Sequence, residues 1–342
     1  MTEINRQMLL AQMPGSGKLE VEHFRLTATE RPIAGKGEAL LRVLYIPLAA
    51  ASRAWMQSAT SRDYDSRAPR SALSAGNVMS GRALAEVVES DDSTFNRGDL
   101  VFAETGWQDY AVLPAPLIEK LPALKPVTYL LSVYGITGLT AYFGLLDCGK
   151  PAPGETVVVS AAAGAVGTIV GQIAKMKSCR VVGITGGAEK CRWLVDELGF
   201  DAAIDYKAGA LRRQIKEIVP EGIDVFFDNT GGEIFEACLH RMNVFGRIAC
   251  CGAVSQYDGA APSHGPRGIP GLVVTKRLTL RGFVVMDFDD RREHALAELH
   301  EWVAAGRLKI HEDVIDGLAN APAALIGLLA GENRGKRIVK VR

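Results

Sequence analysis

The chain has 342 residues, 48% of them hydrophobic, and its 39 lysines and arginines balance its 39 aspartates and glutamates. This length is sufficient for two domains with large apolar cores. The balanced charge gives no net field to attract nucleic acid or an acidic membrane, so we expect neither as a partner. The polar N-terminus lacks the apolar centre of a signal peptide, and no apolar run reaches the length of a membrane span.

The six cysteines show no CxxC spacing, although Cys250 and Cys251 are adjacent. Scattered thiols without a pairing framework are typical of a reduced protein. We therefore expect a cytoplasmic location.

Residues 1–128 contain short alternating runs broken by Gly, Pro and Asp, for example at 39–45 and 98–102. Such runs predict a mostly β domain. The chain becomes β-like again near its end, so we expect 311–342 to complete this first domain.

Strand and helix patterns alternate over residues 129–310. Apolar runs lie at 156–159, 181–185, 202–205, 223–228, 246–252 and 278–285, with amphipathic stretches between them. Repeated β-then-α alternation predicts an α/β Rossmann domain, a doubly wound parallel sheet of six strands.

A small-residue turn follows the first of these strands. The run at 156–159 leads into Ala162, Gly164 and Gly167, and a helical pattern begins at Thr168. Residues without bulk let backbone N–H groups approach a pyrophosphate, and the helix N-terminus adds a partial positive charge. The pattern predicts a dinucleotide site, with Ala162 where the fingerprint has its first glycine.

The tip of the second strand indicates which dinucleotide binds. An NAD site carries Asp or Glu there, whereas this chain has Thr185 and Gly186, followed by Lys190. An ammonium without a carboxylate favours a 2′-phosphate, so we expect NADPH rather than NADH. Lys190 is also compatible with a solvated helix position, and we expect Glu189 to point to solvent in the first helical turn.

Eight segments in register carry a family resemblance, and a ninth, 106–110, adds to it in the first domain. The eight are 138–146, 161–167, 188–190, 205–207, 228–232, 251–257, 282–285 and 331–336. The chain resembles a medium-chain dehydrogenase/reductase of the zinc-independent branch, which contains prostaglandin reductases (leukotriene B4 12-hydroxydehydrogenases), curcumin reductases and plant 2-alkenal double-bond reductases. The resemblance implies a GroES-like first domain, NADPH as cofactor, and a homodimer in which 278–285 is an edge strand.

The resemblance also implies which residues contact the cofactor. Its pyrophosphate, its 2′-phosphate and its nicotinamide half would be contacted along the chain, and the C-terminal segment would close over it. The contacts implied are Gly164, Ala165, Val166, Gly167, Gly186, Lys190, Tyr206, Asn229, Cys251, Gly252, Ala253, Val254, Ser255, Tyr257, Phe283, Val284, Val285 and, from the C-terminal segment, Asn333. Several of these have a structural alternative. Asn229 could cap a helix, 283–285 could be an ordinary buried strand, and we favour a core role for the Cys251 side chain while its backbone contacts the cofactor.

Zinc ligands are missing where zinc dehydrogenases of this fold need them. No cysteine precedes Cys148, and no histidine lies between His23 and His240. His23 lies in the run 19–26, where we expect a solvent-facing strand. We therefore expect no metal, and without a Lewis acid we expect reduction of an activated double bond rather than alcohol oxidation.

The expected substrate is a small enone or enal that accepts hydride at its β-carbon. Charge then gathers on the carbonyl oxygen, and Tyr257 is the candidate hydrogen-bond donor to it. Tyr257 could equally only shape the cleft. Two further functions stay open: an NADPH:quinone oxidoreductase, and a non-catalytic NADPH-binding protein.

The first domain departs from the family pattern. An Asp-Pro turn is replaced at Ala49 and Ala50, glycines are lost within 79–85, and a Met-Pro pair is replaced at 136–137. These changes leave the substrate open, and the candidate substrate contacts are Ser52, Arg53 and Met286. A P-loop fragment at 15–18 lacks the upstream glycine and the following Ser or Thr, so we reject it.

Overall fold

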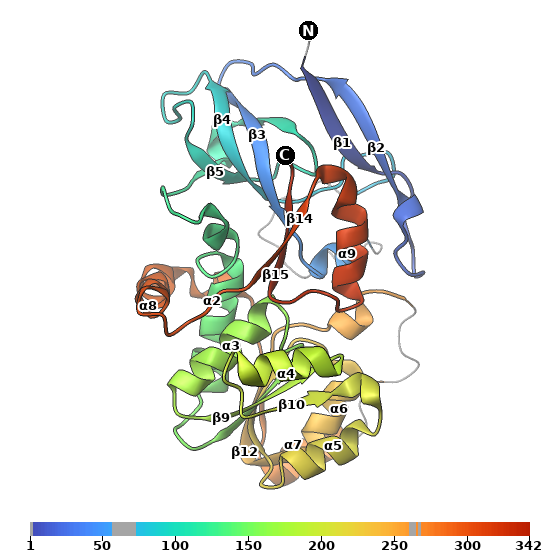
Figure 1. Ribbon diagram of the computed structural model, residues 1–342, viewed down its shortest axis with the longest axis vertical. Coiled ribbons are helices and arrows are strands. Elements are labelled where there is room, and N and C mark those ends of the chain that lie inside the picture. The colour runs from blue at the N-terminus through green and yellow to red at the C-terminus, as the bar shows by residue number, and fades with distance from the viewer. Residues whose placement is uncertain (1–2, 57–72, 260–264, 266–267) are drawn as a thin grey trace.

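The computed structural model describes residues 3–56, 73–259, 265 and 268–342 (Figure 1). Its largest parallel sheet has the strand order β10-β9-β8-β11-β12-β13. The strands are β8 Thr156–Ser160, β9 Arg180–Thr185, β10 Ala202–Asp205, β11 Ile223–Asp228, β12 Met242–Cys250 and β13 Thr279–Gly282. The predicted doubly wound sheet of six parallel strands is confirmed.

Two strand boundaries differ from those predicted. β12 begins at Met242, four residues earlier than the sequence indicated. β13 ends at Gly282, because a 3-10 helix starts at Val285 and the Val284 N–H is bonded to the Asp287 side chain. The interpretation of 283–285 as a buried strand is therefore wrong.

Both faces of this sheet are covered, which explains the uninterrupted valine run of β8. Val157 and Val159 pack against a core shared with α2 Ile136–Phe143, α3 Ala165–Met176, α4 Ala188–Asp196 and α8 Arg292–Ala304. Val158 faces the opposite core, formed with α5 Leu211–Ile218, α6 Gly232–Arg241 and α7 Ile269–Lys276.

The first domain is mostly β, as predicted. Its main sheet has the order β14-β15-β3-β4-β5-β7, with β6 also beside β3. The strands are β3 Glu38–Pro47, β4 Ala83–Ser90, β5 Leu100–Ala103, β6 Tyr110–Pro114, β7 Glu119–Lys120, β14 Glu312–Asp316 and β15 Lys336–Lys340, and β1 Ile4–Leu10 pairs separately with β2 Phe24–Glu30. Of the two C-terminal strands, β15 thus lies beside β3 and β14 lies beyond it, and α9 Ala321–Leu329 connects the two (Figure 1).

His23 is not on a strand, contrary to the prediction. It ends the 3-10 turn Val21–His23, because its Nδ1 accepts a hydrogen bond of 2.9 Å from the Glu20 N–H. Among the described residues no helix is both long enough and apolar enough to cross a membrane.

Candidate active site

The turn between β8 and α3 is shaped by close packing. Gly164 is the N-cap of α3, and the first turn of this helix contains no acidic residue. A Cβ at Gly167 would lie 2.5 Å from the Ala161 carbonyl oxygen, so only glycine fits there. The helix therefore presents its unpaired N–H groups and the positive end of its dipole to an incoming anion.

The structure also explains why alanine is tolerated at the first fingerprint position. Ala162 is fully buried against β9, and its side chain occupies space left by Gly183. A Cβ at Gly183 would come within 2.8 Å of the Ala162 Cβ. The missing side chain is thus on the neighbouring strand, at Gly183, instead of at the first position of the turn, and the turn still packs closely against β9.

Three cations gather around the tip of β9, and we call Lys190, Lys207 and Arg334 the cationic cluster. Lys207 follows β10, the neighbour of β9, and a Cβ at Gly186 would lie 2.8 Å from its Cε. Tyr206 packs at the same place and is 39% exposed. Parallel strand order thus brings residues after β10 to the tip of β9.

Lys190 links this cluster to the C-terminal segment. Its Nζ donates to the carbonyl oxygens of Gly331 (2.5 Å) and Asn333 (2.7 Å). Burial and the positive charges of Lys207, Arg334 and Arg337 lower the pKa of Lys190 to about 8. The ammonium is therefore destabilised until an anion enters the cluster.

Asp205 and Glu189, which lie beside the cationic cluster, are bonded to groups other than the Lys190 ammonium. Asp205 Oδ1 accepts the backbone N–H groups of Gly187 (2.8 Å) and Lys207 (2.9 Å). Glu189 is exposed, as predicted, and pairs with Arg334 at the outer edge. β9 ends at Thr185, followed by Gly186, without a carboxylate of its own, and three cations lie around this point, so the residues present fit the 2′-phosphate of NADPH.

The centre of the site is fixed at the ends of β8 and β11. The buried Asp228 carboxylate accepts hydrogen bonds from Ser160 Oγ (2.7 Å) and from the Thr230 and Gly231 N–H groups. Burial raises the pKa of Asp228 although these bonds oppose it. Asn229 Nδ2 donates to the Ser160 carbonyl oxygen (2.7 Å), so its side chain joins two strands rather than capping a helix.

The segment after β12 forms a second fixed element, and we call residues 251–258 the tyrosine turn. Its backbone is bonded to 228–230: the Cys251 N–H donates to Asp228 O (2.8 Å), and the Ser255 N–H donates to Thr230 O (3.1 Å). Tyr257 folds back over the turn, because its hydroxyl oxygen accepts the Ala253 N–H at 3.2 Å.

Cys251 behaves as the sequence indicated for its side chain. It is half-buried, packs on the apolar core, and burial with nearby Asp228, Cys250 and Cys148 raises its pKa to about 12. Such a thiol stays protonated and is a poor nucleophile.

The other predicted cofactor contacts are placed less directly. The Phe283 ring packs against Phe227 and Phe288, and a Cβ at Gly144 would lie 2.3 Å from it. Val284 and Val285 are half-buried at the start of the following 3-10 helix. Asn333 is buried, and its Nδ2 donates to the Gly335 carbonyl oxygen at 2.7 Å.

The C-terminal segment also reaches the pyrophosphate turn directly. The Gly335 N–H donates to the Ala163 carbonyl oxygen at 2.9 Å, and Gly335 forms a β-bridge with Gly164. The segment 331–335 therefore touches both the pyrophosphate turn and the cationic cluster.

The candidate substrate contacts lie in different environments. Ser52 and Arg53 are buried in the short helix α1 Ala51–Trp55, and Arg53 is paired with Asp258. Met286 is half-buried in the 3-10 helix after β13. Arg82, one of the departures from the family pattern, pairs with Glu119 and covers the Phe102 ring at the surface.

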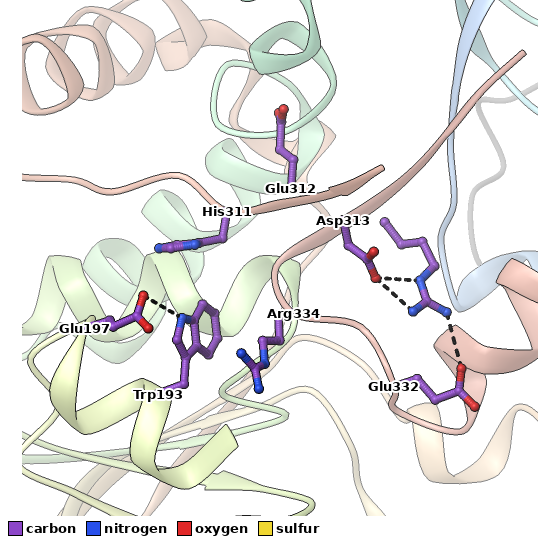
Figure 2. Close-up of a pocket in the computed structure, with 8 residues that line it drawn as sticks. Trp193, Glu197, His311, Glu312, Asp313, Glu332 and Arg334 are labelled. Carbon is purple, nitrogen blue, oxygen red and sulfur yellow. Dashed lines mark hydrogen bonds and ion pairs between the residues drawn. The ribbon is translucent and has the colours of Figure 1, made fainter. Parts of the chain in front are cut away.

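A polar cavity of about 440 Å³ adjoins the cationic cluster, with which it shares Arg334 (Figure 2). It is lined by Trp193, Glu197, His311, Glu312, Asp313, Glu332, Arg334 and Arg337. Its four carboxylates outnumber its two arginines, so its charge does not match that of an anionic cofactor. Within the described part of the chain, no group of three or more His, Cys, Asp or Glu side chains could hold a metal ion.

Sequence reasoning missed Lys207, Arg334 and Asp258. Lys207 could have been found from strand order, since β10 is the expected neighbour of β9 and 205–207 was already part of the resemblance. Arg334 lies in 331–336, also a segment of the resemblance, but no local pattern indicates what Arg334 or Asp258 contacts, because their partners are distant in the chain.

Two family models match the chain. Residues 6–121 match the N-terminal domain of oxidoreductase, and residues 165–302 match a model described as zinc-binding dehydrogenase.

Individual relatives match over almost the full length. The chain is 44% identical to prostaglandin reductase 1 from Bos taurus, covering 93% of each chain, and 40% identical to NADPH-dependent curcumin reductase from Escherichia coli, covering 98% of this chain and 97% of that one. The solved structure of CurA from Vibrio vulnificus in complex with NADPH superposes with a TM-score of 0.90 at 39% identity, covering 98% of this chain and 99% of that one. The protein therefore belongs to the medium-chain dehydrogenase/reductase family, in the branch of the prostaglandin and curcumin reductases, and is an NADP-dependent oxidoreductase.

Proposed function

We propose that this enzyme reduces the carbon–carbon double bond of small α,β-unsaturated aldehydes or ketones with NADPH and without a metal. The cationic cluster is the observation that supports NADPH as the cofactor, because three cations converge where NAD enzymes have a carboxylate. The names of the relatives, a curcumin reductase and a prostaglandin reductase, support the reaction type.

The predicted contacts would bind different parts of NADPH at different places along the edge of the sheet. The turn at 164–167 would hold the pyrophosphate, while Lys190 and Tyr206, with Lys207 and Arg334, would hold the 2′-phosphate. Asn229 would lie along the cofactor, the backbone of 251–255 would line its nicotinamide half, and Asn333 would close over the cofactor from the C-terminal segment. When bound, NADPH supplies the hydride that the substrate's β-carbon accepts.

Tyr257 is the residue that we assign to the developing charge. Hydride addition at the β-carbon leaves negative charge on the substrate's carbonyl oxygen, which a preorganised donor stabilises. The Tyr257 hydroxyl lies above the start of the tyrosine turn, since a Cβ at Gly252 would be 3.5 Å from it. Its oxygen accepts the Ala253 N–H at 3.2 Å, which fixes the phenol over the turn, and a phenol can donate its own hydrogen as well as accept one. Solvent would then protonate the α-carbon.

Consumption of cofactor by the purified protein tests this function. NADPH and NADH are compared with 2-alkenals, aryl enones and quinones as acceptors. We expect NADPH loss with an enone and a saturated carbonyl product. Activity on quinones alone would select quinone reduction instead, and NADPH binding without loss on any acceptor would contradict the proposal.

We also propose a homodimer joined at β13. This strand of four residues is at the edge of the six-stranded sheet, where it can pair with a second copy. Light scattering should give twice the chain mass at micromolar concentration. A monomer across that range would contradict pairing at this edge.

A further inference from the structure

A buried arginine connects the first domain to the tyrosine turn. The Arg53 side chain is fully buried, and its Nε donates to Asp258 Oδ1 at 2.8 Å. These two residues are 205 positions apart in the chain. Asp258 directly follows Tyr257, so the ion pair lies one residue from the proposed hydrogen-bond donor.

The same guanidinium holds a loop of the first domain. Arg53 Nη2 donates to the carbonyl oxygens of Gly15 (3.0 Å) and Gly17 (2.5 Å). This loop contains the segment 15–18 that we rejected as a P-loop, and two of its glycine carbonyl oxygens accept hydrogen bonds from Arg53. The loop then continues to Leu19, whose N–H donates to Asp258 Oδ1 at 2.9 Å. Arg53, Asp258 and residues 15–19 thus form one closed group of contacts.

These contacts are not an efficient source of folding stability, because burying a charged group costs free energy. Among the residues that the structure describes, the buried Arg53 Nη1 has no hydrogen-bond partner. A buried ion pair also often adds no net stability compared with apolar residues of similar size. Such a pair does, however, fix two segments in one relative position, because a guanidinium bonds only along the directions of its N–H groups. The use that fits these contacts is positional.

The helix that carries Arg53 is itself held at its N-terminal end. The Ser52 and Arg53 N–H groups donate to Ala49 O and Ala50 O, each at 3.0 Å. Upstream, Lys336 Nζ donates to the Leu48 carbonyl oxygen at 2.9 Å. The alanines that replace the family's Asp-Pro turn are therefore part of an ordered segment, and Arg53 projects from a fixed base.

We propose that Arg53 is a positioning residue for Tyr257: its guanidinium holds Asp258, and with it the end of the tyrosine turn, against the first domain. This inference rests on the proposed role of Tyr257. A donor must lie within a few tenths of an ångström of its place to act on a developing charge, and a misplacement of about 1 Å can cost about 100-fold in rate. Arg53 therefore acts on turnover without touching cofactor or substrate.

The test uses a pair of substitutions that separates position from stability. Arg53→Met with Asp258→Ala removes both charges, so no unpaired charge stays buried and the protein should remain folded. We expect kcat to fall about tenfold while the Kd for NADPH, measured by fluorescence titration, stays within about twofold. Hydrogen exchange of the amides at 253–258, measured without substrate, should become faster.

A second cycle asks whether the effect passes through Tyr257. In a Tyr257→Phe background the same two substitutions should lower kcat no further, because the donor has already been removed. This comparison needs only a measurable residual kcat in the Tyr257→Phe protein, and the hydrogen-exchange measurement does not depend on turnover.

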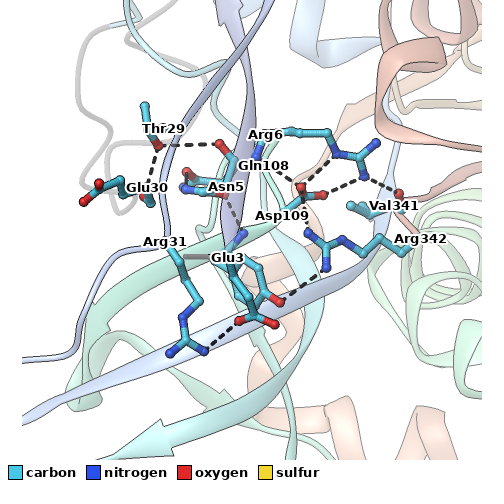
Figure 3. A network of polar contacts seen from close by, with 11 residues as sticks. Glu3, Asn5, Arg6, Thr29, Glu30, Arg31, Gln108, Asp109, Val341 and Arg342 are labelled. Carbon is cyan, nitrogen blue, oxygen red and sulfur yellow. Dashed lines mark hydrogen bonds and ion pairs between the residues drawn. The ribbon is translucent and has the colours of Figure 1, made fainter. Parts of the chain in front are cut away.

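A buried ion pair elsewhere in the first domain provides the control. Asp109 is fully buried and accepts hydrogen bonds from Arg6 Nε (2.8 Å) and Arg342 Nη2 (3.0 Å) (Figure 3). Burial raises the pKa of this carboxyl, but the two guanidinium groups outweigh it and hold the pKa below its usual range. Asp109→Asn should lower the melting temperature and leave kcat and exchange at 253–258 unchanged.

The outcomes separate the two proposals. Unchanged kcat and unchanged exchange in the Arg53→Met/Asp258→Ala protein would overturn the positioning role, as would an equal further loss in the Tyr257→Phe background. If the wild-type protein reduces no enone, the proposed function fails, while faster exchange at 253–258 would still support the positional link.

Discussion

The two ends of the proposed cofactor site are built in opposite ways. The cationic cluster brings Lys190, Lys207 and Arg334 together, and burial, with the positive charges around it, lowers the pKa of Lys190. The tyrosine turn, in contrast, is tied to 228–230 by backbone hydrogen bonds and to the first domain by Arg53. One end is poised to receive an anion, and the other is held in place before anything binds.

This difference indicates what each end does for the enzyme. Repulsion that is relieved on binding contributes to affinity and to the choice between NADPH and NADH. A turn that is already fixed contributes to rate, because its donor needs no reorganisation during the reaction. Substitutions at the two ends should therefore change different kinetic constants.

Tyr257→Phe should give the largest effect and should change turnover alone. Loss of one hydrogen-bond donor to a developing oxyanion typically costs about 100-fold or more in kcat. The phenyl ring keeps the shape of the turn, so the Kd for NADPH should not change. Steady-state kinetics with an enone and a fluorescence titration measure the two quantities. Wild-type turnover in this variant would remove Tyr257 from the mechanism.

Lys190→Met should change affinity and cofactor choice. A charge-assisted hydrogen bond to a phosphate is lost, so the KM for NADPH should rise about tenfold or more while the KM for NADH stays the same. Met keeps the length and apolar part of the side chain. Arg180→Met is a suitable control, since Arg180 bonds the Ile218 carbonyl oxygen away from the strand tip. Equal losses for both cofactors would show that Lys190 only stabilises the C-terminal segment.

The smallest effect should be a dependence of affinity on pH. The pKa of Lys190 is about 8 in the cofactor-free protein, so its positive charge is lost as the pH rises above this value. The Kd for NADPH should then increase relative to the Kd for NADH. The unfolded chain keeps the ordinary lysine pKa of 10.5 and binds more protons between these values. Over this window Lys190 therefore makes the free energy of unfolding rise with pH.

Titrations of both cofactors between pH 7 and 10, on wild-type and Lys190→Met protein, measure this effect. The ratio of the two Kd values should change only in the wild type. A ratio that is constant in the wild type would show that Lys190 keeps its charge throughout.

The cofactor half of the site could be predicted because its signals are local. Ala162, Gly164 and Gly167 follow a buried strand directly, and Gly186 marks the next strand tip by its lack of a carboxylate. Their positions depend on one βαβ unit, whose geometry the strand and helix pattern determines. The exposed Glu189 followed from its place in the first turn of a helix.

The rest depends on contacts between distant segments. Arg53 is paired with Asp258 across 205 positions, and the 15–19 loop contributes carbonyls whose sequence has no signature. Arg334 meets Glu189 through the C-terminal return of the chain. Phe283 looked like a strand residue, but β13 ends before it because the Asp287 carboxylate accepts the Val284 N–H. The pattern of apolar and polar residues within one segment does not indicate such contacts with other segments.

Transfer of a deuterium label would test the proposed reaction most directly. The purified protein is given NADPH labelled at the transferred position of the nicotinamide, together with an aryl enone, and the product is analysed by NMR. The account predicts a saturated ketone with deuterium on the former β-carbon and a solvent hydrogen on the α-carbon. Deuterium on the carbonyl carbon of an allylic alcohol, or an unlabelled product, would contradict it.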